Sequence, residues 1–265
     1  MDETTLEMVL IGNGGKAGGA GAREIAVRHR PGGAPGLFWL GGFRSDMEGS
    51  KASAVDGFAA KRGLAATRFD YSGHGRSGGR FEDGTISRWL EEAVGVFRRF
   101  AKGPQIVVGS SMGGWIALLL AKQLAGSGSL AGLVLIAPAV DMTRKLMWDK
   151  MDKAAQGELE TAGIFHVPSD YSDEPYPITR ALIKDGDAHL FGDGLIETGC
   201  PVHILQGTED TDVPWTHATD LVTHFASDDV VLTLVKGGDH RLSRPEDLAR
   251  LEAAIDGLIA EIARG

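Results

Sequence analysis

A short apolar strand, a serine turn flanked by glycines and an apolar helix together form the feature that most constrains how this chain folds. The segment reads Gln105-Ile106-Val107-Val108-Gly109-Ser110-Ser111-Met112-Gly113-Gly114-Trp115. The pattern Gly109-x-Ser111-x-Gly113 is that of a nucleophile elbow, a strained strand-to-helix turn that lifts a serine hydroxyl above a sheet. The two glycines carry no Cβ atom, so strand and helix can approach each other closely. Ser111 is therefore the candidate nucleophile, and the off-centre Ser110 is assigned to packing or hydrogen bonding beneath the turn.

Strand-like and helix-like segments alternate along the chain. Apolar runs predict strands at residues 6–11, 24–29, 37–40, 65–69, 105–108, 133–137, 202–205 and 230–235. Helical spacing of apolar residues predicts helices at residues 53–61, 85–100, 115–121, 215–225 and 245–262. This alternation predicts one α/β domain with a mostly parallel sheet and helices on both faces. The glycine-rich residues 12–19 lack the spacing of a phosphate-binding loop and are interpreted as a hairpin connection.

Residues 141–190 interrupt the alternation and predict an insertion between two parts of the core, residues 1–140 and 191–265. The insertion is partly helical and rich in methionine and aromatic residues. We expect it to cover the serine as a lid, because adaptable methionine side chains suit acyl chains of varied length. The candidate substrate contacts are Trp115, Met142, Leu146, Met147 and Phe165. Packing of the insertion on the core explains the same residues equally well, and Arg144 and Lys145 are either solvated or partners of a leaving-group carboxylate.

Charge and cysteine content exclude several classes of protein. The formal net charge of −9 opposes binding to nucleic acid, and no apolar run reaches the length of a membrane span. Cys200 is the only cysteine, so the chain forms no internal disulfide and no cysteine-based zinc site. The acidic start Met1-Asp2-Glu3-Thr4-Thr5 fits neither a secretory signal nor an arginine-rich transit peptide. We therefore expect a cytoplasmic protein.

A serine hydroxyl becomes a nucleophile only when a base lies within hydrogen-bond reach and a third group orients that base. In an open parallel sheet such groups gather at the carboxyl ends of the strands. Among the eight histidines, His240 meets this requirement, because it follows the last predicted strand in the loop Gly237-Gly238-Asp239-His240. His74, in another strand-to-helix loop, is the competing candidate for the base.

The candidate acid lies in the loop after the strand at residues 202–205. Asp210 falls a few residues beyond the end of that strand, where a carboxylate can reach the Nδ1 atom of His240. Spacing alone leaves Asp212 and Glu209 as alternatives. With Asp210 as the acid, the order along the chain is nucleophile, acid, base.

The oxyanion that develops during acyl transfer needs preformed N–H donors. Met112 follows the candidate nucleophile and is one expected donor. The second is expected after the strand at residues 37–40, where Gly41-Gly42 lets the backbone turn inward and Phe43 supplies its N–H. A plain turn is the alternative interpretation of the two glycines.

Three motifs carry a family resemblance. They are the elbow Gly109-Ser110-Ser111-Met112-Gly113-Gly114-Trp115, the segment Arg68-Phe69-Asp70-Tyr71-Ser72-Gly73-His74-Gly75, and Gln206-Gly207-x-x-Asp210-x-x-Val213-Pro214-Trp215. Together they resemble the α/β-hydrolase superfamily, and more closely its ABHD10 type, which includes mitochondrial palmitoyl-protein thioesterases and acyl-glucuronide esterases with bacterial relatives. The resemblance implies an eight-stranded, mostly parallel sheet with an inserted helical lid, and it assigns Ser111 as nucleophile, Asp210 as acid and His240 as base. The animal enzymes carry a transit peptide that has no counterpart at the start of this sequence, so their organelle and physiological substrates do not transfer.

The expected activity is hydrolysis of carboxylic esters or thioesters of apolar acyl groups through an acyl-enzyme, without a metal or an organic cofactor. The expected partner is a small ester or thioester, or an acylated protein, and the expected state is a monomer or homodimer. A peptidase of the same fold is the nearest alternative, and a non-catalytic ligand-binding protein of this fold is the alternative from another class. A haloalkane dehalogenase is excluded, because that chemistry needs a carboxylate at the elbow.

Overall fold

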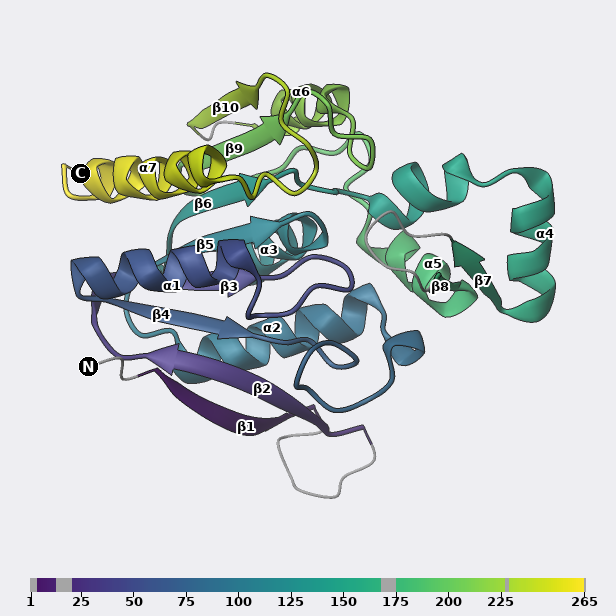
Figure 1. The fold of residues 1–265 in the computed structure, drawn as a ribbon, viewed down its shortest axis with the longest axis horizontal. Helices are drawn as coiled ribbons and strands as arrows, with labels where there is room; N and C mark the ends of the chain where they lie inside the picture. Colours follow the sequence, from purple (N-terminus) through teal and green to yellow (C-terminus); the bar gives the residue numbers. More distant parts are fainter. Residues whose placement is uncertain (1–3, 13–20, 168–174, 227–228, 265) are drawn as a thin grey trace.

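A mostly parallel eight-stranded sheet forms the centre of the protein in a computed structural model that describes residues 4–12, 21–167, 175–226 and 229–264 (Figure 1). The strands, in spatial order, are β1 (Thr5–Ile11), β2 (Arg23–Arg30), β4 (Leu64–Phe69), β3 (Gly33–Leu40), β5 (Gln105–Ser110), β6 (Leu130–Ile136), β9 (Val202–Gly207) and β10 (Val230–Val235). Strand β2 is antiparallel to both neighbours, and the other neighbouring pairs are parallel. The predicted sheet is therefore confirmed. The predicted hairpin connection at residues 12–19 lies almost wholly outside the described residues.

Helices cover both faces of this sheet, as predicted. Helices α1 (Ser50–Arg62) and α7 (Pro245–Ile262) lie on one face, and α2 (Ile86–Phe100), α3 (Met112–Leu124) and α6 (Trp215–His224) lie on the other. The side chains of β3 show why both faces are apolar. Leu37 and Trp39 pack in the cluster with α1 and α7, while Phe38 and Leu40 pack in the cluster with α2 and α3. Successive strand side chains point to opposite faces, so a continuous apolar run fills both cores.

The segment between β6 and β9 leaves the sheet at the ends of the parallel strands and extends to the right in Figure 1. It contains short single-turn helices, helix α4 (Lys153–Ala162), a two-stranded sheet of β7 (Ile164–Val167) and β8 (Tyr176–Thr179), and helix α5 (Arg180–Gly186). The insertion is thus partly helical, and it also contains the β7–β8 pair, which the sequence analysis did not predict. A small apolar cluster built on Leu159, Ile178 and Ile183 holds these elements together.

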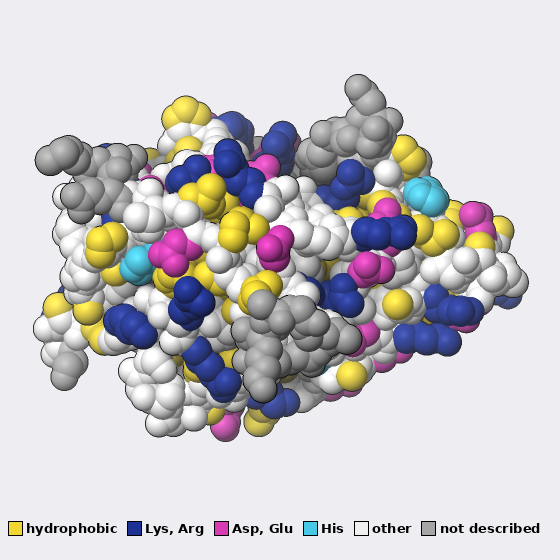
Figure 2. All heavy atoms as spheres, turned by 90° about the horizontal axis from the view of Figure 1, so that it is seen from below, with side chains coloured by type: hydrophobic (Ala, Val, Ile, Leu, Met, Phe, Trp, Pro, Cys, Tyr) yellow, Lys and Arg dark blue, Asp and Glu magenta, His cyan; other side chains and the backbone are white. Residues whose placement is uncertain are grey.

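The exposed surface mixes side chains of both charges. On the face shown in Figure 2, Lys and Arg are interspersed with Asp, Glu and apolar side chains. No helix within the described ranges combines the length and the apolar character that crossing a bilayer requires.

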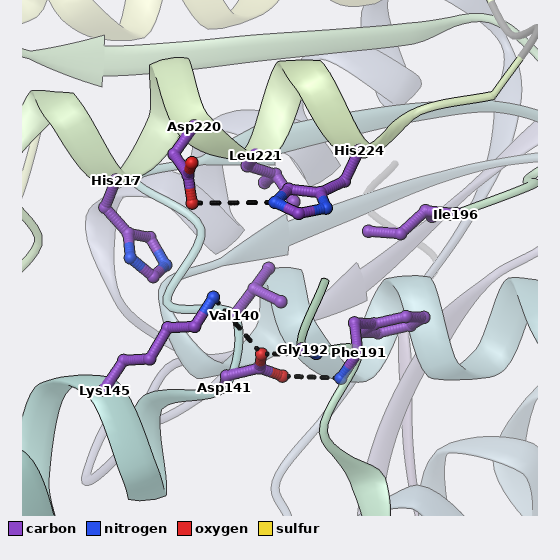
Figure 3. Close-up of a pocket in the computed structure, with 10 residues that line it drawn as sticks. All are labelled: Val140, Asp141, Lys145, Phe191, Gly192, Ile196, His217, Asp220, Leu221 and His224. Atoms are coloured by element: carbon purple, nitrogen blue, oxygen red, sulfur yellow. Dashed lines mark hydrogen bonds and ion pairs between the residues drawn. The ribbon is translucent and has the colours of Figure 1, made fainter. Parts of the chain in front are cut away.

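A buried carboxylate joins the two ends of the inserted segment (Figure 3). Asp141 accepts hydrogen bonds from the backbone N–H groups of Phe191 and Gly192, at 2.8 and 3.0 Å. Its side chain also lies 3.5 Å from Lys145, while Arg144 is ion-paired with a second carboxylate of the segment at 2.7 Å. Both basic residues that were considered as partners of a leaving group therefore have carboxylate partners within the protein.

Candidate active site

The turn between β5 and α3 has the strained geometry of an elbow. Ser111 adopts φ 55° and ψ −118°, a conformation that costs a non-glycine residue about 1–3 kcal/mol and that only the surrounding structure can enforce. A Cβ atom on Gly113 would lie 2.1 Å from the carbonyl oxygen of Leu40, and one on Gly109 would lie 2.4 Å from the carbonyl oxygen of Gly113. The close approach that the two glycines predict is therefore confirmed.

Three side chains that are distant in the sequence meet at this turn. The Nε2 atom of His240 lies 3.0 Å from the Oγ atom of Ser111, and its Nδ1 atom lies 2.9 Å from Oδ2 of Asp210. The loops that follow β9 and β10 deliver the acid and the imidazole. The end of β9 and the loop after β10 touch backbone to backbone, since a Cβ atom on Gly207 would lie 2.2 Å from the carbonyl oxygen of Gly238. The sheet edge thus brings together the three residues that were expected to form the triad.

Four hydrogen bonds fix the carboxylate of Asp210, whose side chain is fully buried. Its Oδ1 atom accepts from the backbone N–H groups of Asp212 and Val213, at 3.0 and 2.8 Å. Its Oδ2 atom accepts from the amide of Gln206 at 3.0 Å, in addition to its contact with His240. The side chain that contacts the imidazole is therefore that of Asp210, while Asp212 contributes a backbone donor.

One group within the described part of the chain has the spacing of a metal site. The ligand atoms of Asp210, Asp212 and His240 all lie within 4.8 Å of one another. A cation bound there would compete with the two hydrogen bonds of the imidazole, and this grouping fits the serine arrangement better than a metal centre.

The two predicted oxyanion donors flank Ser111. Met112 is the first residue of α3, where backbone N–H groups have no partner within the helix. Gly42 lies directly against the serine, since a Cβ atom on it would be 3.3 Å from the Cβ atom and 4.0 Å from the Oγ atom of Ser111. Phe43 follows in the same turn. The turn that contains Phe43 and the first residue of α3 therefore both lie beside Ser111, and the role of their N–H groups as oxyanion donors stays a prediction.

The competing histidine has a different environment. His74 is 5% exposed, its Nε2 atom accepts the backbone N–H of Arg44 at 3.1 Å, and its Nδ1 atom lies 3.2 Å from the carbonyl oxygen of Ser72. Burial lowers the pKa of this imidazole to about 4. Both ring nitrogens are therefore committed to backbone groups, and the contact with Ser111 is made by His240.

The candidate substrate contacts fall into two groups. Trp115 is completely buried and Met142 is almost so, and both belong to the core cluster. Leu146 and Met147 are partly buried against the same cluster, and Phe165 packs in the cluster of the inserted segment. Their roles toward a substrate stay predictions.

Two residues of the site were not anticipated from the sequence. Gln206 orients the acid through its amide, as described above. Lys51, at the start of α1, donates from Nζ to the carbonyl oxygen of Arg241, directly after His240. Burial lowers the pKa of this lysine to about 8. A lysine 190 residues away from its partner carries no sequence signal, whereas the glutamine lies within a motif that was already noted.

Comparison with known proteins places this geometry in a family context. Residues 29–251 match the Alpha/beta hydrolase family. The chain is 35% identical over 240 residues to a protein of Bos taurus named "Palmitoyl-protein thioesterase ABHD10, mitochondrial". The alignment covers 90% of this chain and 78% of the bovine protein.

Two solved structures are similar over nearly the whole chain. A putative hydrolase from Agrobacterium vitis S4 is 50% identical with a TM-score of 0.91, and the alpha/beta hydrolase domain-containing protein 10 from mouse is 32% identical with a TM-score of 0.86. Each alignment covers 97% of this chain and 99% of the other. The expected cytoplasmic location is contradicted by the name of the bovine relative, which is a mitochondrial protein.

Proposed function

Because the chain belongs to the alpha/beta hydrolase family and is a hydrolase, we propose that it cleaves thioesters and esters of apolar acyl groups through an acyl-enzyme on Ser111. The observation that carries this proposal is the continuous chain from the Ser111 hydroxyl through His240 to Asp210, with contacts of 3.0 and 2.9 Å. The name of the bovine relative, a palmitoyl-protein thioesterase, supports a thioester of a long acyl group as the substrate class.

The first half of the proposed reaction forms the acyl-enzyme. The Oγ atom of Ser111 attacks the acyl carbon while the Nε2 atom of His240 takes the hydroxyl proton. Asp210 holds the Nδ1–H of the imidazole and stabilises the positive charge that develops on the ring. The N–H groups of Met112 and Phe43 donate to the oxyanion of the tetrahedral intermediate.

His240 then returns its proton to the sulfur or oxygen of the leaving group, the tetrahedral intermediate collapses to the acyl-enzyme, and the thiol or alcohol departs. In the second half, the imidazole takes a proton from water as the water attacks the acyl carbon. The second tetrahedral intermediate collapses to the carboxylic acid while His240 gives that proton back to the Oγ atom of Ser111. The methionine and aromatic side chains of residues 141–190 would line the path of the acyl chain.

A fluorophosphonate probe and a p-nitrophenyl ester test the reaction class with one pair of variants. Ser111→Ala should lose both covalent labelling and ester turnover while its circular dichroism spectrum is unchanged. Ser110→Ala is the matched control, because it removes a hydroxyl one position away and should keep both activities. Turnover that survives in Ser111→Ala would show that another group carries the chemistry.

The substrate class is tested with matched pairs of esters and thioesters that carry the same acyl group. With acyl chains from two to sixteen carbons, we expect kcat/KM to rise with length, because each buried methylene contributes about 0.8 kcal/mol. A preference for acetyl or for charged acyl groups would contradict an apolar acyl site.

A further inference from the structure

The predicted oxyanion donor Phe43 belongs to a tight turn that runs from Gly42 to Ser45. The N–H of Ser45 donates to the carbonyl oxygen of Gly42 at 3.2 Å, and Arg44 adopts φ 55°, the left-handed conformation that such a turn requires. The peptide between Gly42 and Phe43 is planar and trans, so its N–H points opposite to its carbonyl group. Because the carbonyl is held inside the turn, the Phe43 N–H points out of it. Whatever orients the turn therefore orients this donor.

His74 holds the turn from the side of the core. Its Nε2 atom accepts the N–H of Arg44 at 3.1 Å, in the peptide that directly follows Phe43. The Nδ1 atom can contact the carbonyl oxygen of Ser72 only as a donor, so the ring is the Nδ1–H tautomer with a free lone pair on Nε2. A protonated imidazole has no such lone pair. The low pKa of His74, about 4, means that the ring remains an acceptor at neutral pH.

An aromatic cage fixes the position of the imidazole. Its ring lies edge-on to Trp89, Phe81 and Tyr71, with centroid distances of 5.3, 5.1 and 5.8 Å. Its surroundings are almost fully closed to water, as its exposed fraction of 5% shows. The hydrogen bond to Arg44 is therefore made by a side chain that has few other positions to adopt.

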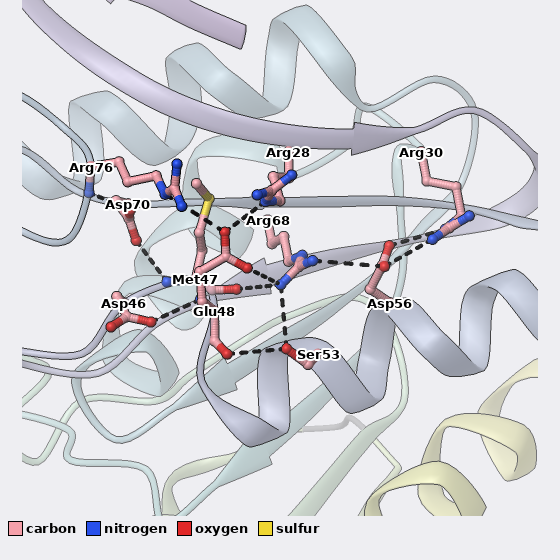
Figure 4. A network of polar contacts seen from close by, with 10 residues as sticks. All are labelled: Arg28, Arg30, Asp46, Met47, Glu48, Ser53, Asp56, Arg68, Asp70 and Arg76. Carbon is pink, nitrogen blue, oxygen red and sulfur yellow. Dashed lines mark hydrogen bonds and ion pairs between the residues drawn. The ribbon is translucent and has the colours of Figure 1, made fainter. Parts of the chain in front are cut away.

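The chain that continues from the turn is anchored by the same region of the fold (Figure 4). The carboxylate of Asp70 accepts the N–H of Met47 at 2.6 Å, and the guanidinium of Arg68 donates to the carbonyl oxygen of Met47 at 2.6 Å. Both residues lie at the end of β4, a few positions before His74. One strand end thus holds the turn and the residues after it at three backbone groups.

The inserted segment also touches the turn. The guanidinium of Arg44 donates to the carbonyl oxygen of Pro175 at 3.4 Å, and the ring of Phe43 packs against Tyr176 with a centroid distance of 5.9 Å. These contacts come from the start of β8 and the residue before it, whereas the contact with His74 comes from the core. The core contact is the one that does not depend on the position of the inserted segment.

We infer that His74 is a positioning residue for the oxyanion turn, which acts through the backbone of Arg44 to aim the Phe43 N–H at the reacting oxygen. The inference deepens the proposed function and rests on it. It assigns the imidazole a role in stabilising the transition state without contact to the substrate and without proton transfer.

The test compares His74→Leu with His74→Gln. Leucine fills the space without an acceptor, whereas the glutamine oxygen can reach the position of Nε2 and accept the same N–H. We expect His74→Leu to lower kcat for a p-nitrophenyl ester about 10- to 100-fold, less than the roughly 10²- to 10³-fold loss of a whole oxyanion donor, with KM unchanged. The affinity for an aryl boronic acid, which mimics the tetrahedral intermediate, should fall by the same factor as kcat. His74→Gln should restore most of both.

Tyr71→Phe is the matched control. It keeps a ring against the imidazole and removes an oxygen that has no hydrogen-bond partner among the described residues, so kcat should be unchanged. If His74→Leu does not fold, His74→Phe offers a second variant that keeps a ring in the aromatic cage and lacks the acceptor.

Three results would overturn the inference. One is a variant without the acceptor whose kcat and boronate affinity remain within twofold of wild type. Another is an equal loss of kcat in His74→Gln and His74→Leu that is proportional to the fall in their melting temperatures. That result would mean that His74 contributes through packing alone. The third is loss of the acidic limb of the kcat pH profile in His74→Leu, which would make His74 a base, since kcat falls at low pH as a base is protonated. Absence of turnover and of fluorophosphonate labelling in the wild-type protein is a separate outcome, because it would end the proposed function itself.

Discussion

Replacing Asp210 by asparagine isolates the contribution of one negative charge at almost constant shape. The two oxygen atoms of the carboxylate have different partners. Oδ1 accepts two backbone N–H groups, from Asp212 and Val213, whereas Oδ2 faces the amide nitrogen of Gln206 and Nδ1 of His240. An asparagine must place its oxygen on one side and its NH2 group on the other.

The network decides which way the asparagine side chain turns. With its NH2 group at the Oδ1 position, the amide would oppose two fixed backbone donors in a fully buried site. With its oxygen there, both donors are satisfied, and the NH2 group faces Nδ1 of His240. The amide nitrogen of Gln206 then loses this acceptor but keeps its two others, the carbonyl oxygens of Val213 and Gly207. The imidazole must accept at Nδ1, so its proton moves to Nε2, and the ring can no longer take the proton of Ser111.

We therefore expect Asp210→Asn to lower kcat about 10⁴-fold, which is the loss known for a triad held in the wrong tautomer and corresponds to about 5 kcal/mol of activation free energy. The assay is steady-state hydrolysis of a p-nitrophenyl ester, with the rate of fluorophosphonate labelling as a second measurement. Asp212→Asn is the matched control in the same loop and should stay within about threefold of wild type. The reasoning is refuted if Asp210→Asn keeps more than a tenth of kcat, or if Asp212→Asn reproduces the loss.

Three further predictions concern the elbow, His74 and the inserted segment. Gly113→Ala should lower the free energy of unfolding by about 3 kcal/mol or more, because its Cβ atom would lie 2.1 Å from a carbonyl oxygen, whereas Gly57→Ala, in an open helical position, should raise it by about 0.5–1 kcal/mol; urea unfolding measures both. The pKa of His74 falls from 6.5 in the unfolded chain to about 4 in the fold, so between these pH values only the unfolded state takes up the proton. Acidification from pH 6.5 to 4 should therefore remove up to about 3 kcal/mol of stability from the wild type, and His74→Gln should lack this part of the pH dependence; an equal dependence in both proteins would contradict the assignment. Asp141→Ala leaves two buried N–H groups without an acceptor and should cost about 2 kcal/mol, with faster proteolysis within residues 141–190 than in the core; unchanged cleavage would show that the carboxylate does not hold this segment.

The parts of the site that follow from local pattern could be predicted from the sequence. The elbow could be predicted because its pattern of glycine and serine is local in the sequence, although the contact that requires Gly113 comes from the distant carbonyl oxygen of Leu40. The assignment of Asp210 needed more, since spacing alone left Asp212 and Glu209 open. What separates them in the structure is the direction of each side chain in the loop, and a sequence does not record this direction.

Features that depend on distant partners could not be predicted. His74 lies in a loop at a strand end, as His240 does. Only the turn against which His74 packs shows that its Nε2 atom accepts a hydrogen bond from a backbone N–H. The contact from Lys51 spans 190 residues and follows from the packing of α1 beside the last loop. The β7–β8 pair was missed because each strand has only four residues, too few for an alternating pattern to stand out from the surrounding helices.

The core is stabilised by more buried apolar packing than the inserted segment. This difference determines which parts of the site can move. The three triad residues follow β5, β9 and β10, whose side chains belong to two large apolar clusters. In the described part of the inserted segment, the segment's own cluster contains three buried apolar residues, and Met142 and Leu182 pack in the core cluster. Segments with few buried contacts open locally at lower free energy than the core. We therefore expect residues 141–190 to move when an acyl chain enters. The distances between the Ser111 hydroxyl, the His240 imidazole and the Asp210 carboxylate should stay fixed. The core and the inserted segment also meet at the oxyanion turn, where Pro175 and His74 each contact Arg44. An anchor on the core side lets the donor keep its direction while the segment above it rearranges for acyl groups of different length.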